Sequence, residues 1–596
     1  MPLNKRTSEV LWAAGLLLLL AACSRIVGPD QPGATPLPSA TPQPTASPSA
    51  TPTLTPTPTS TSTPTPTPTA PPVSVSGELR QALLSTVVAR PGAPCGVVDL
   101  LDFPLSPPDA PNVRGGDDYG VHRERFNGYH AGEDWGIRGG SLGQPVYSIG
   151  HGQVTYAEPY GWGVDIGTVI IRHTFSDSTS ILSFYGHLDP PSVDLRVGQC
   201  VTRGEQIGRI GKPSTPPHLH FEIRSHMPAK PGPGYWSVDP SLAGWKPPSQ
   251  FIWNNRMAAL PGVAWVWPFI PPSQSVGVLN GDTFVAVDGE RIVAIKLSDG
   301  RLSWTRPFTA GQMSTAIINA DQTLLYICDQ LGRLEAFSSP GPSLVALWQL
   351  NLDTVGRPGL IPLPGGGVAV YTYGRLFGVS PEGQLIWKLG ALPTSLDWSL
   401  AGEQLILTSP IQKAPVWVID RSQPVTWTMQ ISGRPLVAGE QILIHGREGV
   451  YRLEADTRSP ELVHLLPPAM LEPGDMIALS DGGLLVAHVD QTDRRLIALN
   501  ADGSLRWQRS YAHVMRGNPR LLASGQRVYV LLQEDGLYQD RVELFELDMD
   551  TAELRRIFTG GTRSGLASDG WVLALDNGRL LIDVAGSSLV ALDTKN

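Results

Sequence analysis

The stretch Ala498-Leu499-Asn500-Ala501-Asp502-Gly503-Ser504-Leu505-Arg506-Trp507 contains the pattern that decides the fold of the C-terminal half. A short apolar strand ends at Leu499, a turn made of Asn, Asp and Gly follows, and the next strand is centred on Trp507. Asn, Asp and Gly tolerate the backbone conformations of tight turns. Two apolar runs separated by such a turn predict a β-hairpin.

The same unit recurs from about residue 260 onward, in eight copies spaced about 34 to 48 residues apart, the period expected of propeller blades. Clear copies are 293–297 with Trp304, 376–379 with Trp387, 416–419 with Trp427 and 496–499 with Trp507. Weaker copies are 334–337 with Trp348, 450–453, 544–547 and 589–592. The repeat predicts an all-β propeller of eight blades, with seven as the alternative.

The quoted stretch resembles the quinoprotein-type (PQQ-like) propeller repeat, which implies a propeller over residues 260–596. Residues 264–268 (AWVWP) are expected to pair with the last copy and close the ring, because closure removes exposed strand edges. Quinoprotein dehydrogenases use a calcium site and a vicinal cysteine pair. Cys328 is the one cysteine in this half, so we expect no quinone cofactor and interpret the propeller as a binding platform for a protein or polymer partner.

Upstream of the repeats lie three short motifs that contain histidine. They are residues 129–134 (YHAGED), 185–188 (YGHL) and 218–222 (HLHFE). Each is weak alone, because a lone histidine is more often structural than a ligand. Side chains alternate between the faces of a strand, so His218 and His220 are expected to point the same way.

Together the motifs supply the ligands of a metal site. His130, Asp134 and the two histidines of the strand offer up to four nitrogen and oxygen ligands. Catalytic zinc takes three protein ligands and keeps one position for water. One histidine of the strand pair, together with His187, is then left for acid/base work or for stabilising an oxyanion.

The chain around these motifs predicts a small β domain. Residues 168–173 and 181–185 read as paired strands around a polar turn, and 152–154 and 161–163 as short strands cut by glycines. No amphipathic helix of normal length is expected in this stretch. No His-Glu-x-x-His helix occurs either, so thermolysin-type chemistry is not indicated.

The order and spacing of the motifs resemble the lysostaphin/LytM-type zinc peptidases, over roughly residues 112–245 and including the tail 237–240 (SVDP). The resemblance implies a small antiparallel β domain within residues 90–250 and murein endopeptidase activity with one Zn²⁺ per chain. It also implies roles for five residues: His130, Asp134 and His220 as metal ligands, and His187 and His218 as catalytic histidines. All five are present, whereas many relatives that act only as regulators have lost one or more.

Three further residues of this domain leave alternatives open. Glu222 would orient a ligand if strand alternation holds, or lie exposed at the strand end. Cys95 and Cys200 would form a disulfide in an oxidising compartment, if they lie close together. The loop 212–217 (KPSTPP) is richer in proline than the family pattern, which bears on the shape of the substrate groove.

The N-terminus predicts export and lipid anchoring. Lys5 and Arg6 precede an apolar run that ends in Leu20-Ala21-Ala22-Cys23, which resembles a bacterial lipobox. The resemblance implies that residues 1–23 form the signal and that Cys23 carries the lipid; the alternative is an ordinary signal peptide with a chance cysteine. Residues 24–75 are a Pro/Thr/Ser-rich linker that cannot bury a core and is expected to be disordered. The Pro/Thr-rich tract within it, from about Pro29 to Pro72, has an extended reach on the order of 130 Å. An extracytoplasmic, membrane-anchored location follows.

A net charge of −9 over 596 residues, with no basic stripe, argues against nucleic acid as a partner. The expected partners are therefore the peptide stems of peptidoglycan, the membrane and an unidentified ligand of the propeller. The leading hypothesis is a lipid-tethered zinc endopeptidase. Its rivals are a non-catalytic wall-binding or amidase-activating lipoprotein, and an assembly scaffold built on the propeller.

Overall fold

The computed structural model describes residues 93–594 apart from residue 117 and several short stretches. Those stretches are 270–272, 309–314, 339–343, 394, 402–403, 412, 420–423, 440, 455–458, 470–472, 491–492, 512–518, 535–538, 564–569 and 576. The expected signal segment, Cys23 and the linker 24–75 lie outside the described residues. Within the described part, no helix is both long enough and apolar enough to cross a bilayer.

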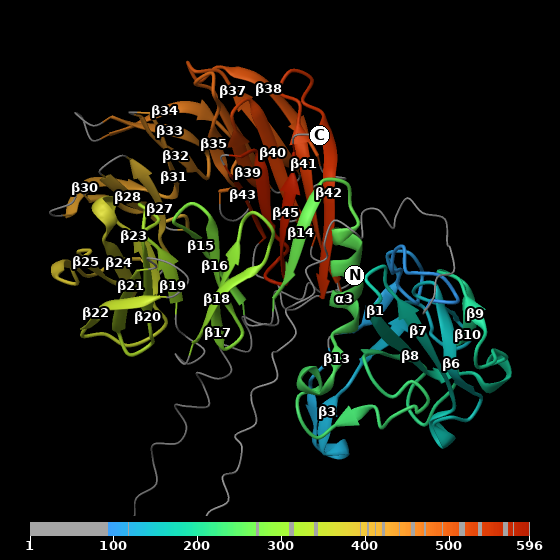
Figure 1. Ribbon diagram of the computed structural model, residues 1–596. Helices are drawn as coiled ribbons and strands as arrows, with labels where there is room; N and C mark the ends of the chain where they lie inside the picture. The colour runs from blue at the N-terminus through green and yellow to red at the C-terminus, as the bar shows by residue number, and fades with distance from the viewer. Residues whose placement is uncertain are drawn as a thin grey trace, which may run out of the picture. The chain divides into compact units, whose positions relative to one another are not determined.

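The first domain is built on an eight-stranded sheet in the order β1-β4-β11-β8-β7-β6-β9, with β13 also paired to β11 (Figure 1). Its strands are β1 (Val113–Gly115), β4 (Glu133–Ile137), β6 (Gly152–Glu158), β7 (Gly167–Thr174), β8 (Ser180–Leu188), β9 (Cys200–Val201), β11 (Leu219–Arg224) and β13 (Trp245–Lys246). The expected pairing of 168–173 with 181–185 is confirmed, because β7 and β8 are antiparallel neighbours.

Two smaller sheets complete this domain. One has the order β12-β3-β2, from Tyr235–Trp236, Gly128–His130 and His122–Arg123, and the other pairs β5 (Pro145–Tyr147) with β10 (Gln206–Arg209). The remaining regular elements are the short 3₁₀ turns η1 (Glu124–Phe126), η2 (Gly163–Asp165), η3 (Pro190–Ser192) and η4 (Pro240–Ala243). The expectation of a β domain without a normal-length helix therefore holds for the described residues between β1 and β13.

The segment before β1 is part of the core. Leu101, Phe103 and Leu105 have no exposed surface, and the Phe103 ring lies 5.7 Å from the Trp135 ring of β4. Cys95 forms a disulfide with Cys200 at the start of β9, so the pairing that the sequence left open is made. The bond fastens this segment to the edge strand of the sheet.

One helix, α3 (Pro248–Ala258), follows β13. Its first turn is fixed by Glu133 of β4, a buried carboxylate that accepts hydrogen bonds from the backbone N–H and the hydroxyl of Ser249 at 3.1 and 2.9 Å. A carboxylate at a helix N-terminus satisfies donors that have no partner within the helix and is favoured by the helix dipole. Further along, Asn255 accepts a hydrogen bond from the Leu101 N–H.

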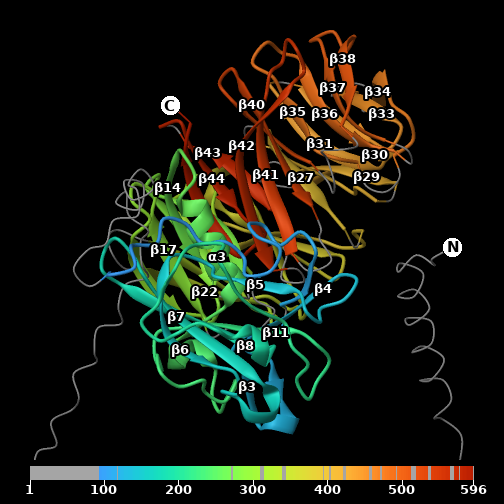
Figure 2. The same cartoon turned by 90° about the vertical axis from the view of Figure 1, so that its right-hand side faces the viewer.

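The C-terminal region consists of eight four-stranded antiparallel sheets within the described residues, as a propeller requires (Figure 2). Seven are consecutive: β15 (Ser273–Leu279), β16 (Thr283–Asp288), β17 (Arg291–Lys296), β18 (Leu302–Pro307); β19 (Thr315–Ile318), β20 (Leu324–Cys328), β21 (Arg333–Ser338), β22 (Val345–Asn351); β23 (Gly359–Pro362), β24 (Val368–Thr372), β25 (Arg375–Val379), β26 (Leu385–Leu389); β27 (Asp397–Ala401), β28 (Gln404–Thr408), β29 (Ala414–Ile419), β30 (Pro424–Ile431); β31 (Gly433–Ala438), β32 (Gln441–Gly446), β33 (Gly449–Glu454), β34 (Ser459–Leu465); β35 (Met476–Ala478), β36 (Leu484–Val489), β37 (Arg494–Leu499), β38 (Leu505–Ser510); β39 (Arg520–Ser524), β40 (Arg527–Glu534), β41 (Gln539–Leu547), β42 (Leu554–Arg563). The 3₁₀ turn η5 (Pro364–Gly366) joins β23 to β24.

The eighth sheet is assembled from both ends of the repeat region. It has the order β14-β45-β44-β43, in which β14 is Val263–Pro268, β43 is Trp571–Ala574, β44 is Arg579–Asp583 and β45 is Ser588–Asp593. Trp267 of β14 pairs with Leu589 of β45, and Val266 with Val590. The expected closing strand is therefore confirmed.

The repeat pattern forms the hairpin that the sequence predicts. β37 and β38 are antiparallel, with Ala498 opposite Trp507. Gly503 has φ of +83°, a left-handed conformation that favours glycine, and the Asp502 carboxylate accepts a hydrogen bond from the Ser504 N–H at 2.9 Å. Cys328, at the end of β20, is free and fully buried, as expected for a small apolar side chain.

Candidate metal centre

Strand pairing brings the first motif and the third motif together. β3 ends at His130, the chain turns through Ala131 and Gly132, and β4 carries Asp134. β11 pairs with β4 in a register that sets His220 directly opposite Asp134. Gly132 is required at the turn, since a Cβ there would lie 2.5 Å from a backbone oxygen of β11 and 3.0 Å from the Nε2 of His220.

Three side-chain atoms converge at this point. His220 Nδ1 lies 3.0 Å from Asp134 Oδ1 and 3.0 Å from His130 Nε2, and His130 Nε2 lies 3.4 Å from the same Asp134 oxygen. Both histidines are buried, and Asp134 is partly exposed. Two imidazole nitrogens and one carboxylate oxygen match the donors of a three-ligand catalytic zinc site, so the residues fit the metal that the sequence predicts.

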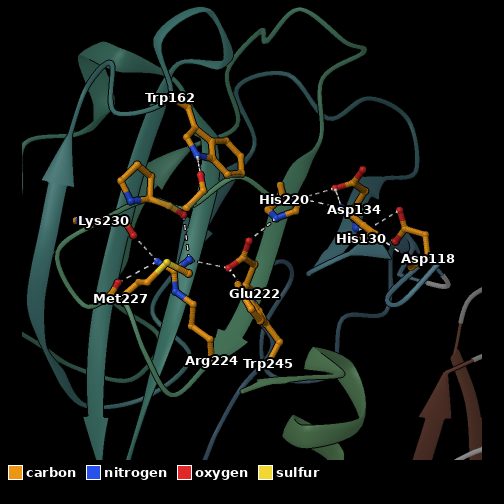
Figure 3. A network of polar contacts seen from close by, with 12 residues as sticks. Asp118, His130, Asp134, Trp162, His220, Glu222, Arg224, Met227, Lys230 and Trp245 are labelled. Atoms are coloured by element: carbon orange, nitrogen blue, oxygen red, sulfur yellow. Dashed lines mark hydrogen bonds and ion pairs between the residues drawn. The ribbon is translucent and has the colours of Figure 1, made fainter. Parts of the chain in front are cut away.

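Each histidine of this triad has a carboxylate on its other ring nitrogen (Figure 3). Asp118 Oδ2 lies 3.1 Å from His130 Nδ1, and Glu222 Oε1 lies 3.1 Å from His220 Nε2. Such partners fix the tautomer and orientation of a metal-bound imidazole and raise its basicity. His130 would therefore bind a metal through Nε2 and His220 through Nδ1.

Asp118 is a functional residue that the sequence reasoning missed. Besides its contact with His130, its carboxylate accepts a hydrogen bond from the Asp134 N–H at 3.1 Å, so it holds two of the three candidate ligands. The available signal was an acidic pair after two glycines, twelve residues before the first histidine, but that pattern predicts no fold of its own.

Glu222 is fully buried, so the exposed alternative is wrong. Its second oxygen accepts hydrogen bonds from Arg224 at 2.8 Å and from the Trp245 indole at 2.9 Å. The Arg224 guanidinium in turn donates to the carbonyls of Met227, Lys230 and Pro231 (Figure 3). Burial raises the pKa of Glu222, but His220 and Arg224 outweigh it and hold that pKa below its ordinary value. The carboxylate is thus kept charged.

His187 and His218 lie beside the triad, with ring centroids 4.5 Å apart. His187 Nδ1 is 2.9 Å from the Asp165 carbonyl, and His218 Nδ1 is 2.7 Å from the Pro216 carbonyl. A carbonyl oxygen can only accept, so Nδ1 carries a proton in both rings. The Nε2 of each neutral ring is then left with a lone pair, and that of His218 lies 3.4 Å from Asp134 Oδ1. Both histidines of the strand pair thus face Asp134, as alternation predicts.

The two rings differ in their preference for a proton. Burial, followed by the neighbouring His218 and His220, lowers the pKa of His187 to about 4. Burial also disfavours a charged His218, but its ion pair with Asp134 is stronger and raises its pKa above the ordinary value. In the metal-free site, His187 is therefore the neutral ring and His218 the one that more readily holds a second proton.

Aromatic side chains form two walls of the site. The Trp162 ring lies 5.2 Å from His187 and 5.1 Å from His220, and the Tyr235 ring lies 5.0 Å from His130. Residues 161–163 were expected as a strand, but they form a loop that leads into η2, whose first residue Gly163 has φ of +60°. The strand interpretation is wrong because the loop turns the Trp162 indole toward the site, where it donates to the Gly232 carbonyl.

Fold and site together define a metallopeptidase-type domain followed by a β-propeller. Residues 128–231 match the model of peptidase family M23, and residues 236–459 match the model described as outer membrane protein assembly factor BamB. The second match begins at Trp236, which pairs with β3 of the peptidase domain, and it ends at the first residue of β34, in the fifth of the seven consecutive propeller sheets. No curated protein matches the chain.

Solved structures similar to this chain are propellers. BamB from Moraxella catarrhalis is 15% identical, with 55% of this chain and 100% of that one covered and a TM-score of 0.40. The WD40 domain of SCAP from fission yeast is 12% identical, covering 56% and 98%, with a TM-score of 0.40. Sqt1 from Saccharomyces cerevisiae is 9% identical, covering 55% and 98%, with a TM-score of 0.41.

Proposed function

We propose that this protein is a lipid-anchored, extracytoplasmic zinc endopeptidase that hydrolyses peptide cross-links of peptidoglycan. The observation that carries the proposal is the convergence of His130 Nε2, Asp134 Oδ1 and His220 Nδ1, with His187 and His218 beside them. The M23 match supports a peptidase, and the lipobox resemblance at Cys23 supports the anchor.

The five residues divide the work of amide hydrolysis. Zn²⁺ bound by His130, Asp134 and His220 would supply Lewis-acid polarisation of the scissile carbonyl and of the attacking water. His187 is neutral near pH 7 because burial lowers its pKa to about 4, and its Nε2 lone pair can accept the water proton as general base.

His218 is assigned the complementary task. When it carries a proton on both ring nitrogens, His218 can donate its Nε2–H to the developing oxyanion or to the leaving nitrogen. Its Nδ1–H is held by the Pro216 carbonyl, in the proline-rich loop 212–217. The stiffness expected of that loop would fix the ring and reduce the reorganisation needed in the transition state.

The rest of the chain sets where the enzyme acts. A lipid on Cys23 and a linker with a reach on the order of 130 Å would let the peptidase domain leave the membrane surface and enter a wall layer. The propeller would serve as a binding platform, and its match to an assembly factor family favours a protein partner. An assembly scaffold with a secondary peptidase is the rival that this match supports. A non-catalytic regulator is disfavoured because all five site residues are present.

Cleavage of purified cross-linked muropeptides by the full chain tests the proposal. We expect one zinc per chain and cleavage that a chelator abolishes. His187→Ala should lower kcat about 100- to 10,000-fold, since it removes the general base, and should keep the zinc. His130→Ala should lose the zinc itself.

His464→Ala is the matched control, because His464 lies in β34 of the propeller. Zinc content is measured by elemental analysis and cleavage by chromatography of the products. A metal-loaded wild-type protein that cuts no cross-link would refute the enzymatic function. Unchanged turnover in His187→Ala would refute the role of that residue.

A further inference from the structure

A short arm of the peptidase domain, residues 122–128, lies next to the candidate metal centre. It runs from β2 through η1 to β3, whose position is marked in Figures 1 and 2. Asn127 closes η1 in a left-handed conformation, with φ of +45°, and its N–H donates to the Glu124 carbonyl. This tight turn presents the side chains of residues 122–127 to solvent.

The tip of the arm is connected to the metal ligands by aromatic contacts. Phe126 stacks on Tyr235 with ring centroids 4.1 Å apart and planes at 20°. The Tyr235 ring in turn lies 5.0 Å from that of His130. Phe126 nevertheless remains 46% exposed, so the stack forms an open edge of the site on which a substrate could lie.

Two positive charges stand on this edge. The Arg125 guanidinium lies 5.3 Å from the centre of the Phe126 ring, and Arg123 lies two residues earlier on β2. Both side chains are exposed, and within the described residues neither is in an ion pair, even with Glu124 between them. By contrast, Arg203, Arg224 and Arg256 of the same region and the adjoining helix are all paired with carboxylates.

Tyr235 connects the arm to the metal centre. Its ring contacts Phe126 of the arm and the candidate ligand His130. A peptide that crosses the metal centre toward the arm would meet positive charge at the end of the aromatic stack.

We propose that Arg123 and Arg125 bind a free carboxylate of the peptide substrate, so that the enzyme prefers stems with ionised side groups to amidated or neutral ones. The inference rests on the proposed function. Separations of 5.3, 4.1 and 5.0 Å connect the Arg125 guanidinium to the His130 ring through Phe126 and Tyr235. At about 3.3 Å per extended residue, the carboxylate belongs at most about four residues from the scissile bond.

Two carboxylates of a cross-linked stem satisfy this limit, namely that of a glutamate residue and the second one of a diamino dicarboxylic acid. The test uses peptide dimers built with 2,6-diaminopimelate in which both groups are free, or one or the other is amidated. Wild type is compared with Arg123→Gln/Arg125→Gln. Arg138→Gln, at the residue that follows the end of β4, is the matched exposed control.

We expect amidation of one of the two groups to lower the kcat/KM of wild type about tenfold, mostly through KM, as for the loss of a charge-assisted hydrogen bond in substrate binding. The double variant should show the same loss on the free dimer and no further loss on the amidated one. Such non-additivity shows that the carboxylate is bound by the arm, because attraction of carboxylates to the metal centre itself would persist in the double variant. The group whose amidation has this effect identifies the carboxylate that is bound.

Any other result overturns either the arginine subsite or the proposed function, and the two failures can be told apart. Equal cleavage of free and amidated dimers by wild type overturns the arginine subsite and leaves the peptidase intact. An amidation effect that persists undiminished in the double variant also overturns it. Wild type that cuts no dimer at all overturns the proposed function instead. Zinc content and Tm verify that the double variant is folded, and the amidation comparison in wild type needs no variant.

Discussion

The peptidase domain and the propeller are both β structures, but they differ in the kind of side chain that they bury. In the peptidase, the buried polar side chains His130, Glu222 and Arg224 belong to one network that runs through His220. In the propeller, strands such as β17 and β25 bury runs of apolar side chains, and the same arrangement recurs from sheet to sheet. Burying a charge is costly unless it is paired, so the peptidase carries groups that stability alone does not require.

This difference predicts how single substitutions in each domain affect chemistry and stability. A polar change in the peptidase should alter chemistry and stability together, because each buried group holds a neighbour. An apolar change in one propeller sheet should cost stability and leave the chemistry unaffected. Beyond the His187→Ala test of the proposed function, four predictions probe this difference.

The largest effect on stability is expected from Glu222→Gln. The amide must turn an N–H₂ toward either His220 or the Arg224 and Trp245 donors, and it leaves the buried guanidinium without a negative partner. Breaking a buried ion pair costs about 3–5 kcal/mol. Denaturant unfolding of the metal-free protein measures the loss, with the exposed Glu158→Gln as control. A change below about 1 kcal/mol would show that this network is not what stabilises the domain.

In the propeller, Leu376→Ala should remove buried apolar volume from β25 and lower the free energy of unfolding by about 2–5 kcal/mol. Turnover of cross-linked peptides at a temperature well below Tm should stay within about twofold of wild type. Calorimetry and activity are measured on the same sample. A parallel loss of kcat in the folded protein would contradict the separation of roles.

Asp118→Asn should weaken zinc binding about 10- to 100-fold, because the carboxylate that orients His130 is replaced by an amide. Competition with a fluorescent chelator gives the affinity. The control is Asp177→Asn, whose carboxylate caps an exposed turn between β7 and β8. Unchanged affinity would show that Asp118 supports the fold and not the metal ligand.

The last prediction concerns pH. Burial lowers the pKa of His445 in β32 to about 3, and burial lowers that of His173 in β7 to about 4. The unfolded rings titrate near 6.5, so protons bind the unfolded state first. Stability is therefore complete above about pH 6.5 and is lost as pH falls toward the folded pKa, by about 1.4 kcal/mol per pH unit for each ring. His445→Gln should flatten the decline for the propeller transition, measured by calorimetry from pH 7 to 4. An unchanged slope would refute this assignment.

Local regularities explain what could be predicted from the sequence. Strand alternation is a property of neighbouring residues, so it correctly predicted that His218 and His220 point the same way; in the structure both face Asp134. The repeat of apolar strand, turn and tryptophan strand is also local, and it predicted the hairpins and the closing strand β14.

What the sequence could not provide depends on distant segments. Asp118 lies in the loop between β1 and β2 and binds the Asp134 N–H of β4, 16 residues further along the chain. Tyr235 and Phe126 meet only because β12 pairs with β3, although more than a hundred residues separate them. Helix α3 is fixed by Glu133, a residue whose position in the first motif indicated nothing about a helix. No spacing rule connects such pairs, so the arm and the second layer of the site become visible only in three dimensions.

The closing strand of the propeller also determines when its last sheet can form during synthesis. Val266 pairs with Val590, so β14 must wait for more than 300 further residues before its partner exists. At about 5–20 residues per second, that delay is roughly 15 to 65 s. During it, two tryptophans of β14 have no sheet to cover them, whereas every strand of the peptidase domain has already left the ribosome. The peptidase can thus be complete while the propeller is still an open series of sheets, which makes β14 the segment most in need of protection until the last sheet has been made.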